Sequence, residues 1–580
     1  MDPMTPPASA AAGAPSRWEK IALVGVLLPI LLVGAQACLG PEETLAFHLY
    51  DDAYYYLGVA RSLARGAGST FDGINPTNGY HPLWCWLLVP IFLLADDPGT
   101  GVRLAGLLWF TVVALASAAL WWALRPRTGP EGAVIAAAVL GLQPVIALGL
   151  RWPNGLETPL YAALIALFIG AFERTLGPGR PLPRTQLFLA LGVLLGLVVL
   201  ARLDAVSLAI VAALLLAAHL WPRYGFRAAL LRIGALTAAA CLVAGPSLVW
   251  NIVRFEHPMP VSGRILSLQA EQEREAYGGA ASLRFLKLRA WYAGVSIPVL
   301  AARGFVEGIP GGEMAHGRGA ALGATFAGAS ALLLAVALAR RRRAGPVSSD
   351  ALTLLAAFCF LHYCVYALWL WTAEEEQYRL YYFLPEIMLL AGATGGALGP
   401  GVKGAWIRPV LRRSLVAACL LLLVVRLVRA TTESIATKES NPGPVATSKG
   451  RIYAWLPRVL PPDAVLGAEN TGRIGYFTRL PVVNLDGLIN DQRLVEAIRD
   501  GRKDLYILQS PIRYIVTDSA YLRGFDVSRP DVPPDPRRDM GELLYRLSRW
   551  HGCTLREIRG APRKEVVVEI IRPERKGTLP

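Results

Sequence analysis

Long apolar stretches with few charges recur along most of this chain, and they constrain its fold more than any other feature. Only 17% of its 580 residues are charged, and the mean hydropathy is +0.41. These values are too apolar for a soluble protein of this length. Stretches of about twenty apolar residues cross a bilayer as helices. The sequence therefore predicts a polytopic α-helical membrane protein.

The first span is predicted at Ile21–Leu39, directly after the basic residues Arg17 and Lys20. This layout resembles a signal sequence, but the lack of a small-residue cleavage site favours a retained anchor with a cytoplasmic N-terminus. Pro82–Ala95 is too short to cross a bilayer, so we expect a re-entrant or interfacial helix on the outer side. Ten further spans, about eleven in all, are expected at 103–124, 131–150, 158–173, 186–200, 205–221, 228–250, 319–339, 351–372, 380–398 and 409–429.

The basic residues support this topology, because every strong basic cluster between spans then falls in an inner loop, as the positive-inside rule requires. These clusters are Arg125 and Arg127; Arg174, Arg180 and Arg184; Arg223, Arg227 and Arg232; Arg340 to Arg343; and Lys403, Arg408, Arg412 and Arg413. A crossing at Pro82–Ala95 would turn Arg340–Arg343 outward. The net charge of +15 thus indicates a lipid bilayer as partner, and no nucleic acid.

An odd number of spans places the C-terminus outside. From about Thr431 the content of Pro, Gly and charge rises, and strand-like runs alternate with helical patterns, which predicts a small extracytoplasmic α/β domain. The strands are expected at Ala464–Ala468, Arg513–Thr517 and Glu565–Ile571, and the helices at Leu494–Arg499 and Gly541–Trp550. The domains are then a disordered cytoplasmic tail (1–20), a membrane domain (21–430) with outer loops at 40–102 and 251–318, and the C-terminal domain (431–580).

Two adjacent carboxylates, Asp51 and Asp52, follow the first span. Carboxylates at the mouth of a membrane helix are paired, hydrated or functional. The next segment, Ala53–Ala64, has mixed faces at helical spacing and is stopped by Gly66, which fits a short interfacial helix. The alternative is that both carboxylates only cap that helix.

Other polar residues gather at the predicted outer ends of the spans. Together with Asp51 and Asp52, the candidate site residues are Tyr54, Asn78, Tyr80, His81, Glu157, Arg202, Asp204, Tyr378 and Arg379. We expect the two aspartates to line one outer cavity with Glu157 and Arg202. As alternatives, Glu157 caps the helix that Pro159 begins, and Arg202 forms an ion pair with Asp204 instead of binding a lipid phosphate.

Metal and redox chemistry have little support in the sequence. No His/Cys cluster has metal-ligand spacing, so His81 is expected to orient a hydrogen bond and no metal ligand is assigned. The seven cysteines mostly lie in apolar runs and are expected to be small buried hydrophobes. The sequence has no Walker loop or dinucleotide fingerprint in its usual setting, and Glu374–Glu376 is most simply a solvated loop.

Taken together and in order, three motifs resemble the GT-C superfamily of polytopic glycosyltransferases. They are Asp51-Asp52-Ala53-Tyr54, then Gly79-Tyr80-His81-Pro82-Leu83-Trp84, then Gly155-Leu156-Glu157-Thr158. The resemblance covers roughly residues 20–430 and is strongest over 45–90 and 150–205. Its acidic motif is closer to the bacterial arabinofuranosyltransferase branch than to the protein O-mannosyltransferases. The run Val482–Leu488 is familiar from bacterial proteins of this layout without indicating an activity.

The resemblance implies a GT-C-like fold with outer interfacial helices and a C-terminal extracytoplasmic α/β domain. It implies transfer of a sugar from a polyprenyl-phosphate donor to an extracytoplasmic glycan, lipid or protein acceptor, in a bacterial inner membrane. One acidic residue would be the base of an inverting displacement, either Asp51 or Asp52. We favour Asp51, with Asp52 orienting an acceptor hydroxyl or a bound divalent cation; no other cofactor is expected.

The chemistry is consistent with this expectation. A phosphate leaving group needs no general acid, unlike the leaving group in glycoside hydrolysis. An aspartate is a weak ground-state base, but it can accept the hydroxyl proton late, as the new C–O bond forms. Two rival classes remain: a transporter or flippase of lipid-linked sugars, and an inactive scaffold. Transporters usually show internal symmetry and midplane broken helices, which this sequence lacks.

Overall fold

The structure is a computed structural model. It describes residues 14–40, 49–95, 97–142, 155–176, 182–292, 351–366, 368, 384–398, 417, 421, 449–522, 525–530, 539–558, 561 and 565–573. The chain forms two compact units that do not follow chain order. Unit 1 comprises residues 1–39, 106–247 and 270–434, and unit 2 comprises residues 40–105, 248–269 and 435–580.

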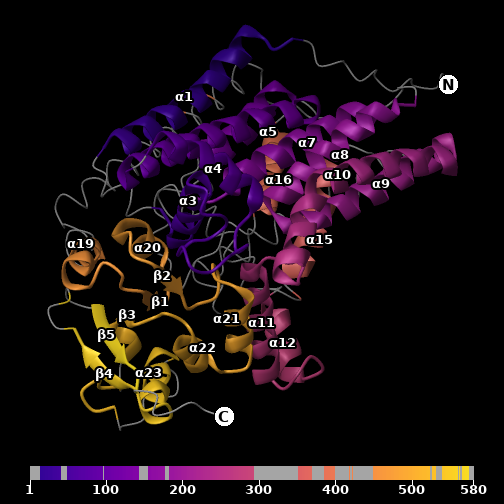
Figure 1. Cartoon of the computed structure of the whole chain (residues 1–580). Coiled ribbons are helices and arrows are strands. Elements are labelled where there is room, and N and C mark those ends of the chain that lie inside the picture. The colour runs from indigo at the N-terminus through magenta and orange to yellow at the C-terminus, as the bar shows by residue number, and fades with distance from the viewer. Residues whose placement is uncertain are drawn as a thin grey trace, which may run out of the picture. The chain divides into compact units, whose positions relative to one another are not determined.

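Unit 1 is built from apolar helices (Figure 1). Those that lie wholly or mostly in it are α1 (Arg17–Leu39), α5 (Pro98–Leu142), α7 (Thr158–Leu176), α8 (Thr185–Ala201), η1 (Leu203–Ala205), α9 (Val206–Tyr224), α10 (Phe226–Phe255), α12 (Leu283–Trp291), α15 (Ala351–Val365) and α16 (Leu384–Leu398). Within the described residues, five helical segments are long and apolar enough to cross a membrane, and α8, α15 and α16 are shorter apolar helices. This confirms a multi-pass helical protein.

The predicted count of eleven spans is not confirmed, because 319–339 and most of 409–429 lie outside the described residues. Where residues are described, the predicted spans coincide with helices. The 45-residue helix α5 contains the two predicted spans 103–124 and 131–150 up to Leu142. They are separated at Gly129, whose φ of 72° breaks the helical geometry.

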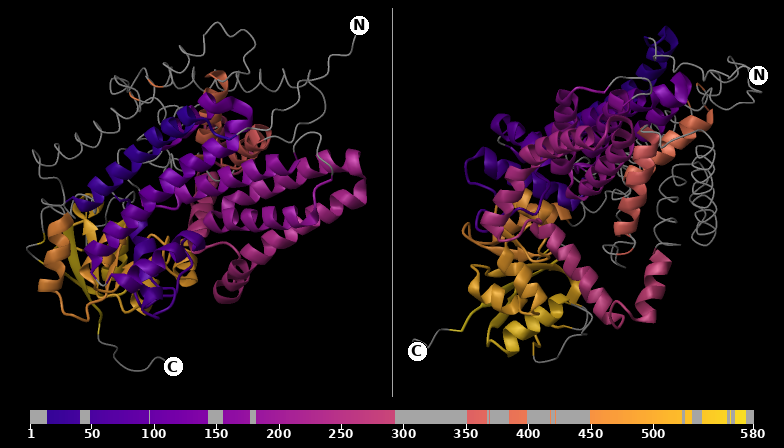
Figure 2. Two further views of the ribbon diagram at one scale, coloured as in Figure 1. Left: turned by 90° about the horizontal axis from the view of Figure 1, so that it is seen from above. Right: turned by 90° about the vertical axis from the view of Figure 1, so that its right-hand side faces the viewer.

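Glycines let helices of unit 1 approach closely, as is usual in membrane bundles. A Cβ atom added at Gly132 of α5 would lie 2.3 Å from the carbonyl oxygen of Gly395 in α16. Similarly, one added at Gly192 of α8 would lie 2.2 Å from the carbonyl oxygen of Leu236, so α8 and α10 run side by side (Figure 2). Ion pairs between Glu19 and Arg125 and between Arg127 and Glu173 join other helices of the unit.

Unit 2 combines the predicted first outer loop (residues 40–102) with the C-terminal domain. The loop contains α3 (Asp51–Ala64) and α4 (Pro82–Leu94). At 13 residues α4 is too short to span a bilayer, as expected for Pro82–Ala95. The end of α10 and the start of α11 (Val261–Ala276) complete the part of unit 2 that precedes the C-terminal domain.

The C-terminal domain holds a five-stranded sheet in the order β2-β1-β3-β5-β4. The strands are β1 (Leu466–Ala468), β2 (Val482–Asn484), β3 (Tyr514–Asp518), β4 (Thr554–Glu557) and β5 (Glu565–Ile571). Its helices are α19 (Lys449–Val459), α20 (Gly472–Thr478), α21 (Gln492–Arg499), α22 (Lys503–Gln509), η7 (Ser519–Leu522) and α23 (Asp539–Arg549). The predicted small α/β domain is therefore present, with strands close to the expected positions.

The sheet of the C-terminal domain has a parallel part and an antiparallel part. β1 pairs in parallel with β2 and β3, with Leu466 opposite Val482 and Tyr514. Each parallel crossover carries helices, as parallel pairing requires. β5 runs antiparallel between β3 and β4, with Ile515 opposite Val568.

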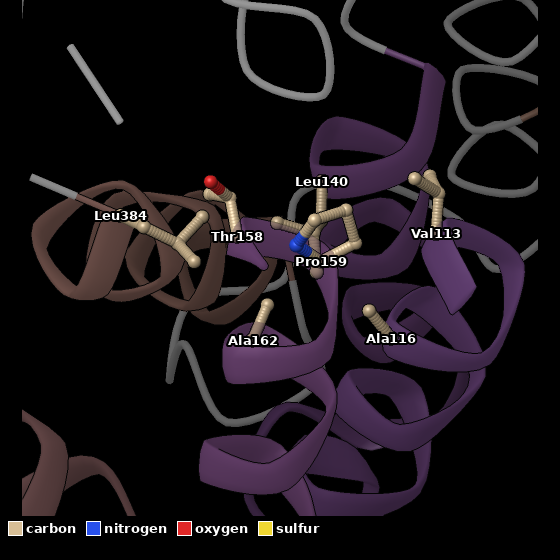
Figure 3. Close-up of a pocket in the computed structure, with 7 residues that line it drawn as sticks. All are labelled: Val113, Ala116, Leu140, Thr158, Pro159, Ala162 and Leu384. Carbon is tan, nitrogen blue, oxygen red and sulfur yellow. The ribbon is translucent and has the colours of Figure 1, made fainter. Parts of the chain in front are cut away.

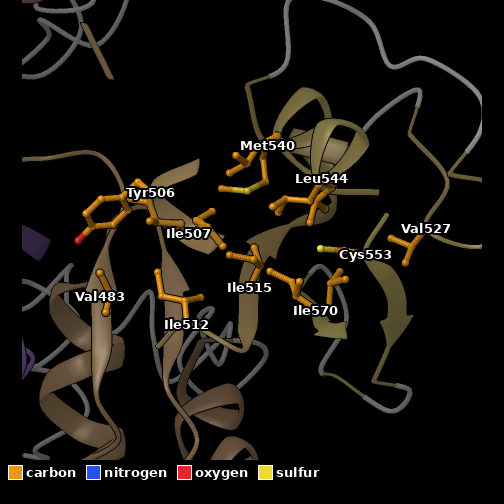
Figure 4. Close-up of a cluster of buried hydrophobic side chains, with 14 of the residues drawn as sticks. Val483, Tyr506, Ile507, Ile512, Ile515, Val527, Met540, Leu544, Cys553 and Ile570 are labelled. Atoms are coloured by element: carbon orange, nitrogen blue, oxygen red, sulfur yellow. The ribbon is translucent and has the colours of Figure 1, made fainter. Parts of the chain in front are cut away.

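Apolar side chains from β2, β3, β5, α22 and α23 form the core on one face of this sheet (Figure 4). Val483, Ile515 and Val568 are fully buried there. A second apolar cluster, formed with α19, includes Ile452 and Leu466. The domain therefore has a hydrophobic core of its own, which fixes the positions of the loops that follow β1 and β2.

Candidate active site

Helix α3 begins at the acidic pair, but neither aspartate is its N-cap. The N-cap is Tyr50, whose side chain makes no capping hydrogen bond, and Asp51 and Asp52 occupy the first turn. Their charge still suits the helix dipole. The Asp51 carboxylate instead binds backbone groups of another helix. The simple capping alternative does not describe this geometry.

Both oxygens of Asp51 accept hydrogen bonds from the C-terminal domain. The backbone N–H of Gly472 donates to Oδ2 at 2.7 Å, and that of Arg473 donates to Oδ1 at 3.0 Å. The guanidinium of Arg473 also donates to the carbonyl oxygen of Leu49. Burial raises the pKa of the Asp51 carboxyl, while the nearby Arg473 charge and the two amides oppose that shift.

One face of α3 contacts the C-terminal domain along its length. Tyr54 is fully buried against the rings of Tyr476 and Phe477, with ring centroids 5.3 and 5.5 Å away. Arg61 donates to the carbonyl oxygen of Tyr476 at 3.0 Å and lies over its ring. The structure packs the Tyr54 ring against these two rings, and the substrate role predicted for Tyr54 stays a prediction.

Tyr55 contacts the carboxyl ends of β1 and β2. Its hydroxyl donates to Asp486 Oδ2 at 3.4 Å and accepts from the Asn484 amide at 3.2 Å. The same amide reaches Thr471 at 3.1 Å, and the backbone N–H of Asn470 donates to Asp486. Ligands of parallel sheets usually bind outside the carboxyl ends of the strands. Here the first outer loop occupies that position.

Asp52 belongs to a different face of α3. Successive helical residues project about 100° apart, so Asp52 shares its face with Tyr56, four residues on. The hydroxyl of Tyr56 accepts from the backbone N–H of His81 at 3.4 Å. Burial and then the charge of Asp52 raise the pKa of Tyr50 to about 12. Asp52 and His81 are both partly exposed.

Asn78 and Tyr80, also predicted to bind substrate, are buried and hold the loop together. The Asn78 side chain donates to Asn251 at 3.0 Å and accepts from the backbone N–H of Val261 at 3.0 Å. The Tyr80 hydroxyl lies 2.7 Å from that of Ser69. A substrate role for either residue stays a prediction.

In unit 1, Glu157, Arg202 and Asp204 come together as an ion-pair network. Arg202 donates to Glu157 at 2.8 Å and to Asp204 at 3.0 Å, and the side chains of Arg202 and Glu157 are each 3% exposed. The Arg202 guanidinium is therefore neutralised by two carboxylates. This geometry supports the ion-pair alternative over phosphate binding.

Three residues of the same network were not among the predicted site residues. His362 of α15 lies 2.8 Å from Glu386 of α16 and 3.6 Å from Asp204. Tyr366 donates to Asp204 at 2.9 Å. The sequence signal for them was an ionisable side chain inside an apolar helix, which usually faces a protein interior.

The remaining predictions concern Tyr378, Arg379, the shared outer cavity and a metal ion. Tyr378 and Arg379 lie outside the described residues. The cavity expected to join the aspartates to Glu157 and Arg202 would span both units and stays a prediction. Within the described ranges, no group of three His, Cys, Asp or Glu side chains could hold a metal ion. Both Asp51 oxygens accept N–H bonds, and a divalent cation near the two aspartates stays a prediction.

A small apolar pocket lies between α5, α7 and α16 in unit 1 (Figure 3). Its lining is Val113, Ala116, Leu140, Thr158, Pro159, Ala162 and Leu384. Thr158, of the Gly-Leu-Glu-Thr motif, contributes the one polar side chain of this set and is 5% exposed. The lining suits a hydrocarbon group.

Comparison with known proteins bears on fold and family. A family model described as "Domain of unknown function (DUF8728)" matches residues 439–561. No curated protein matches the chain. Among solved structures, the chain is similar to apo ArnT from Cupriavidus metallidurans, with 13% identity and a TM-score of 0.51 over 95% of this chain and 97% of that one.

Two other solved structures are similar at lower TM-scores. Archaeal oligosaccharyltransferase AglB from Archaeoglobus fulgidus, in complex with an inhibitory peptide and a dolichol-phosphate, has 14% identity and a TM-score of 0.46 over 97% of this chain and 76% of that one. Arabinosyltransferase EmbB from Mycobacterium smegmatis has 15% identity and a TM-score of 0.31, over 73% and 41%.

The apolar helices and the likeness to ArnT define the class: the chain is a multi-pass membrane protein with the GT-C fold. Within that class, it carries a C-terminal domain that matches the domain of unknown function over 439–561.

Proposed function

We propose that the protein is a membrane glycosyltransferase that moves a sugar from a polyprenyl-phosphate donor to an extracytoplasmic acceptor. One observation carries the proposal. In a chain with the GT-C fold, an aspartate pair opens the first described helix after α1, and the C-terminal domain holds that pair in place through Asp51. The acceptor is a glycan, lipid or protein of the cell envelope.

The proposed reaction is an inverting displacement. The acceptor oxygen forms a bond to the anomeric carbon as the bond from that carbon to the phosphate oxygen breaks. The polyprenyl phosphate leaves with the bonding electrons, and one aspartate of the pair takes the acceptor proton. Because the hydroxyl becomes acidic as its oxygen bonds to carbon, a carboxylate suffices as the base.

The location follows from the same proposal. A lipid-linked donor restricts the enzyme to a membrane, here the bacterial inner membrane, with the N-terminus cytoplasmic. The first outer loop and the C-terminal domain contact each other directly, and we place both on the extracytoplasmic side. The C-terminal domain then contributes to acceptor selection, since binding far from the reacting bond positions a substrate.

A panel of donors tests the proposal. Purified full-length protein in lipid nanodiscs is incubated with polyprenyl-phosphate mannose, glucose, galactose, arabinofuranose and aminoarabinose, each with envelope lipid or peptide acceptors. We expect release of polyprenyl phosphate from one donor. Asp52→Asn should lower that turnover by roughly 10²–10⁴, the usual effect of losing a general base.

Asp500→Asn is the matched control, because it makes the same carboxylate-to-amide change at an exposed position in the C-terminal domain and should turn over like the wild type. Wild-type protein that consumes none of the donors would contradict the proposal. An Asp52→Asn variant with full turnover would leave glycosyl transfer standing but remove Asp52 as the base.

A further inference from the structure

The structure shows how the Asp51 carboxylate is held. Both oxygens of Asp51 accept backbone N–H bonds, from Gly472 at 2.7 Å and from Arg473 at 3.0 Å. The two donors lie more than 420 residues away in the chain. These two hydrogen bonds occupy an acceptor site on each oxygen and direct the carboxylate toward the start of α20. Asp51 is thus already bound within the protein.

The start of α3 and the start of α20 approach each other very closely. A Cβ atom added at Gly472 would lie 2.0 Å from the backbone oxygen of Asp51 and 2.9 Å from its Oδ2. No side chain is compatible with that distance unless the backbone moves. Glycine at 472 therefore allows the amides to reach the carboxylate.

The remaining contacts of α3 follow the same face. Asp51, Tyr54, Tyr55 and Arg61 recur at helical spacing, and each contacts the C-terminal domain. Asp52 projects about 100° away from Asp51. Its face is that of Tyr56, which accepts from the backbone N–H of His81.

From this arrangement we infer that Asp51 is a positioning residue, clamped by the amides of Gly472 and Arg473, and that Asp52 is the carboxylate that takes the acceptor proton. The inference rests on the proposed glycosyl transfer and assigns a role to each aspartate. The clamp fixes the first turn of α3, and so the direction in which Asp52 projects. It also reverses the roles expected from the sequence, where Asp51 was favoured as the base.

The inference is tested with full-length protein in nanodiscs and four variants: Asp51→Asn, Asp52→Asn, Gly472→Ala and Gly475→Ala. The last is the matched control, because it makes the same change on the same helix, but its new Cβ would meet the ring of Phe71 at 2.7 Å and not the backbone of α3. Two quantities are measured: hydrogen exchange of the amides in 472–478 without substrate, and the pH profile of kcat/KM with the donor that the wild type consumes.

We expect Gly472→Ala and Asp51→Asn to speed exchange at the first two amides of α20 and to lower kcat/KM by roughly 10²-fold, the scale of a 1 Å misplacement. Both should keep the acid limb of the pH profile, because the base is still present. Asp52→Asn should leave exchange unchanged and lose the acid limb. Gly475→Ala should behave like the wild type in both measurements.

Loss of the acid limb in Asp51→Asn with its retention in Asp52→Asn would overturn the assignment. A Gly472→Ala variant with the hydrogen exchange and turnover of the wild type would also overturn it. If Gly472→Ala does not fold, the same two measurements on Asp51→Asn decide the question. If the wild type consumes no donor, the proposed function fails. The exchange measurement then still decides whether Asp51 is clamped.

Discussion

Arg202 shows how a residue's role depends on neighbours that come from distant parts of the chain. In the sequence, Arg202 lies two residues before Asp204 and has the features of a phosphate ligand at the end of a span. In the structure it is matched by Glu157 as well as Asp204, and His362 and Glu386 extend the network. This buried cation is paired within the protein, and removing one carboxylate would leave its charge partly uncompensated.

Replacing Glu157 tests this reading. Glu157→Gln leaves Arg202 with one counter-charge in a buried site, and we expect it to cost about 3–5 kcal/mol of unfolding free energy. The measurement is an SDS unfolding titration of the purified protein.

Glu271→Gln is the control, because its ion pair with Arg274 has a similar N–O distance of 2.9 Å but is 53% exposed at the glutamate. It should cost at most about 1 kcal/mol. Equal losses in the two variants would show that the Glu157 pair does not hold α7 to the end of α8.

At the scale of elements, one glycine on α3 and one on α20 make room for the same aromatic ring. A Cβ added at Gly58 of α3 would lie 2.5 Å from the ring of Phe71, and one added at Gly475 of α20 would lie 2.7 Å from the same ring. Phe71 therefore fills the space between the two helices. Tyr55 meets it edge-on, with ring centroids 5.4 Å apart.

A double-mutant cycle follows from this arrangement. Gly58→Ala and Gly475→Ala each push the ring toward the other helix, and each should cost about 1 kcal/mol or less, the lower end of overpacking. Together they leave the ring no space, so the double variant should lose more than the sum.

Phe71→Leu should restore most of that loss. The free energies come from the same SDS titration. Strict additivity, or no rescue by Phe71→Leu, would mean that the ring is not confined between the helices.

Local patterns were sufficient to predict several elements. The helix over Ala53–Ala64, the short helix after Pro82 and the strands near Ala464 and Glu565 all follow from spacing, turn residues and β-branched runs. The partner of α3 could not be predicted in this way. Its contact face carries two tyrosines and an aspartate, which favoured a substrate site, and the residues that bind them lie about 420 positions later.

At the scale of the whole molecule, unit 2 gathers three distant segments, so chain order and spatial order differ. Hydropathy predicts the described spans well, because each span is a local property. It correctly brought Glu157, Arg202 and Asp204 to one set of helix ends. It missed His362 and Glu386, because a single ionisable residue hardly changes the hydropathy of an apolar helix.

The contact within unit 2 predicts a shared side for two parts of the chain. Cysteines at Arg65 of the first outer loop and at Asp500 of the C-terminal domain, both exposed, should react together with an impermeant maleimide in intact spheroplasts. Arg223→Cys, in a predicted inner loop, should react only after permeabilisation. The parent carries Cys241→Ala, because Cys241 is exposed. Labelling of Asp500→Cys only after permeabilisation would contradict the topology.

The bond between Asp51 and Gly472 also has a consequence for biosynthesis. The two residues are 421 positions apart, so at about 5–20 residues per second the ribosome needs roughly 20–80 s to supply the second partner. During that interval the first outer loop has been made but its carboxylate has no amides to bind. A nascent chain interrupted before α20 should therefore carry an acidic motif that is not yet aligned, and activity should appear only when the last quarter of the polypeptide has folded.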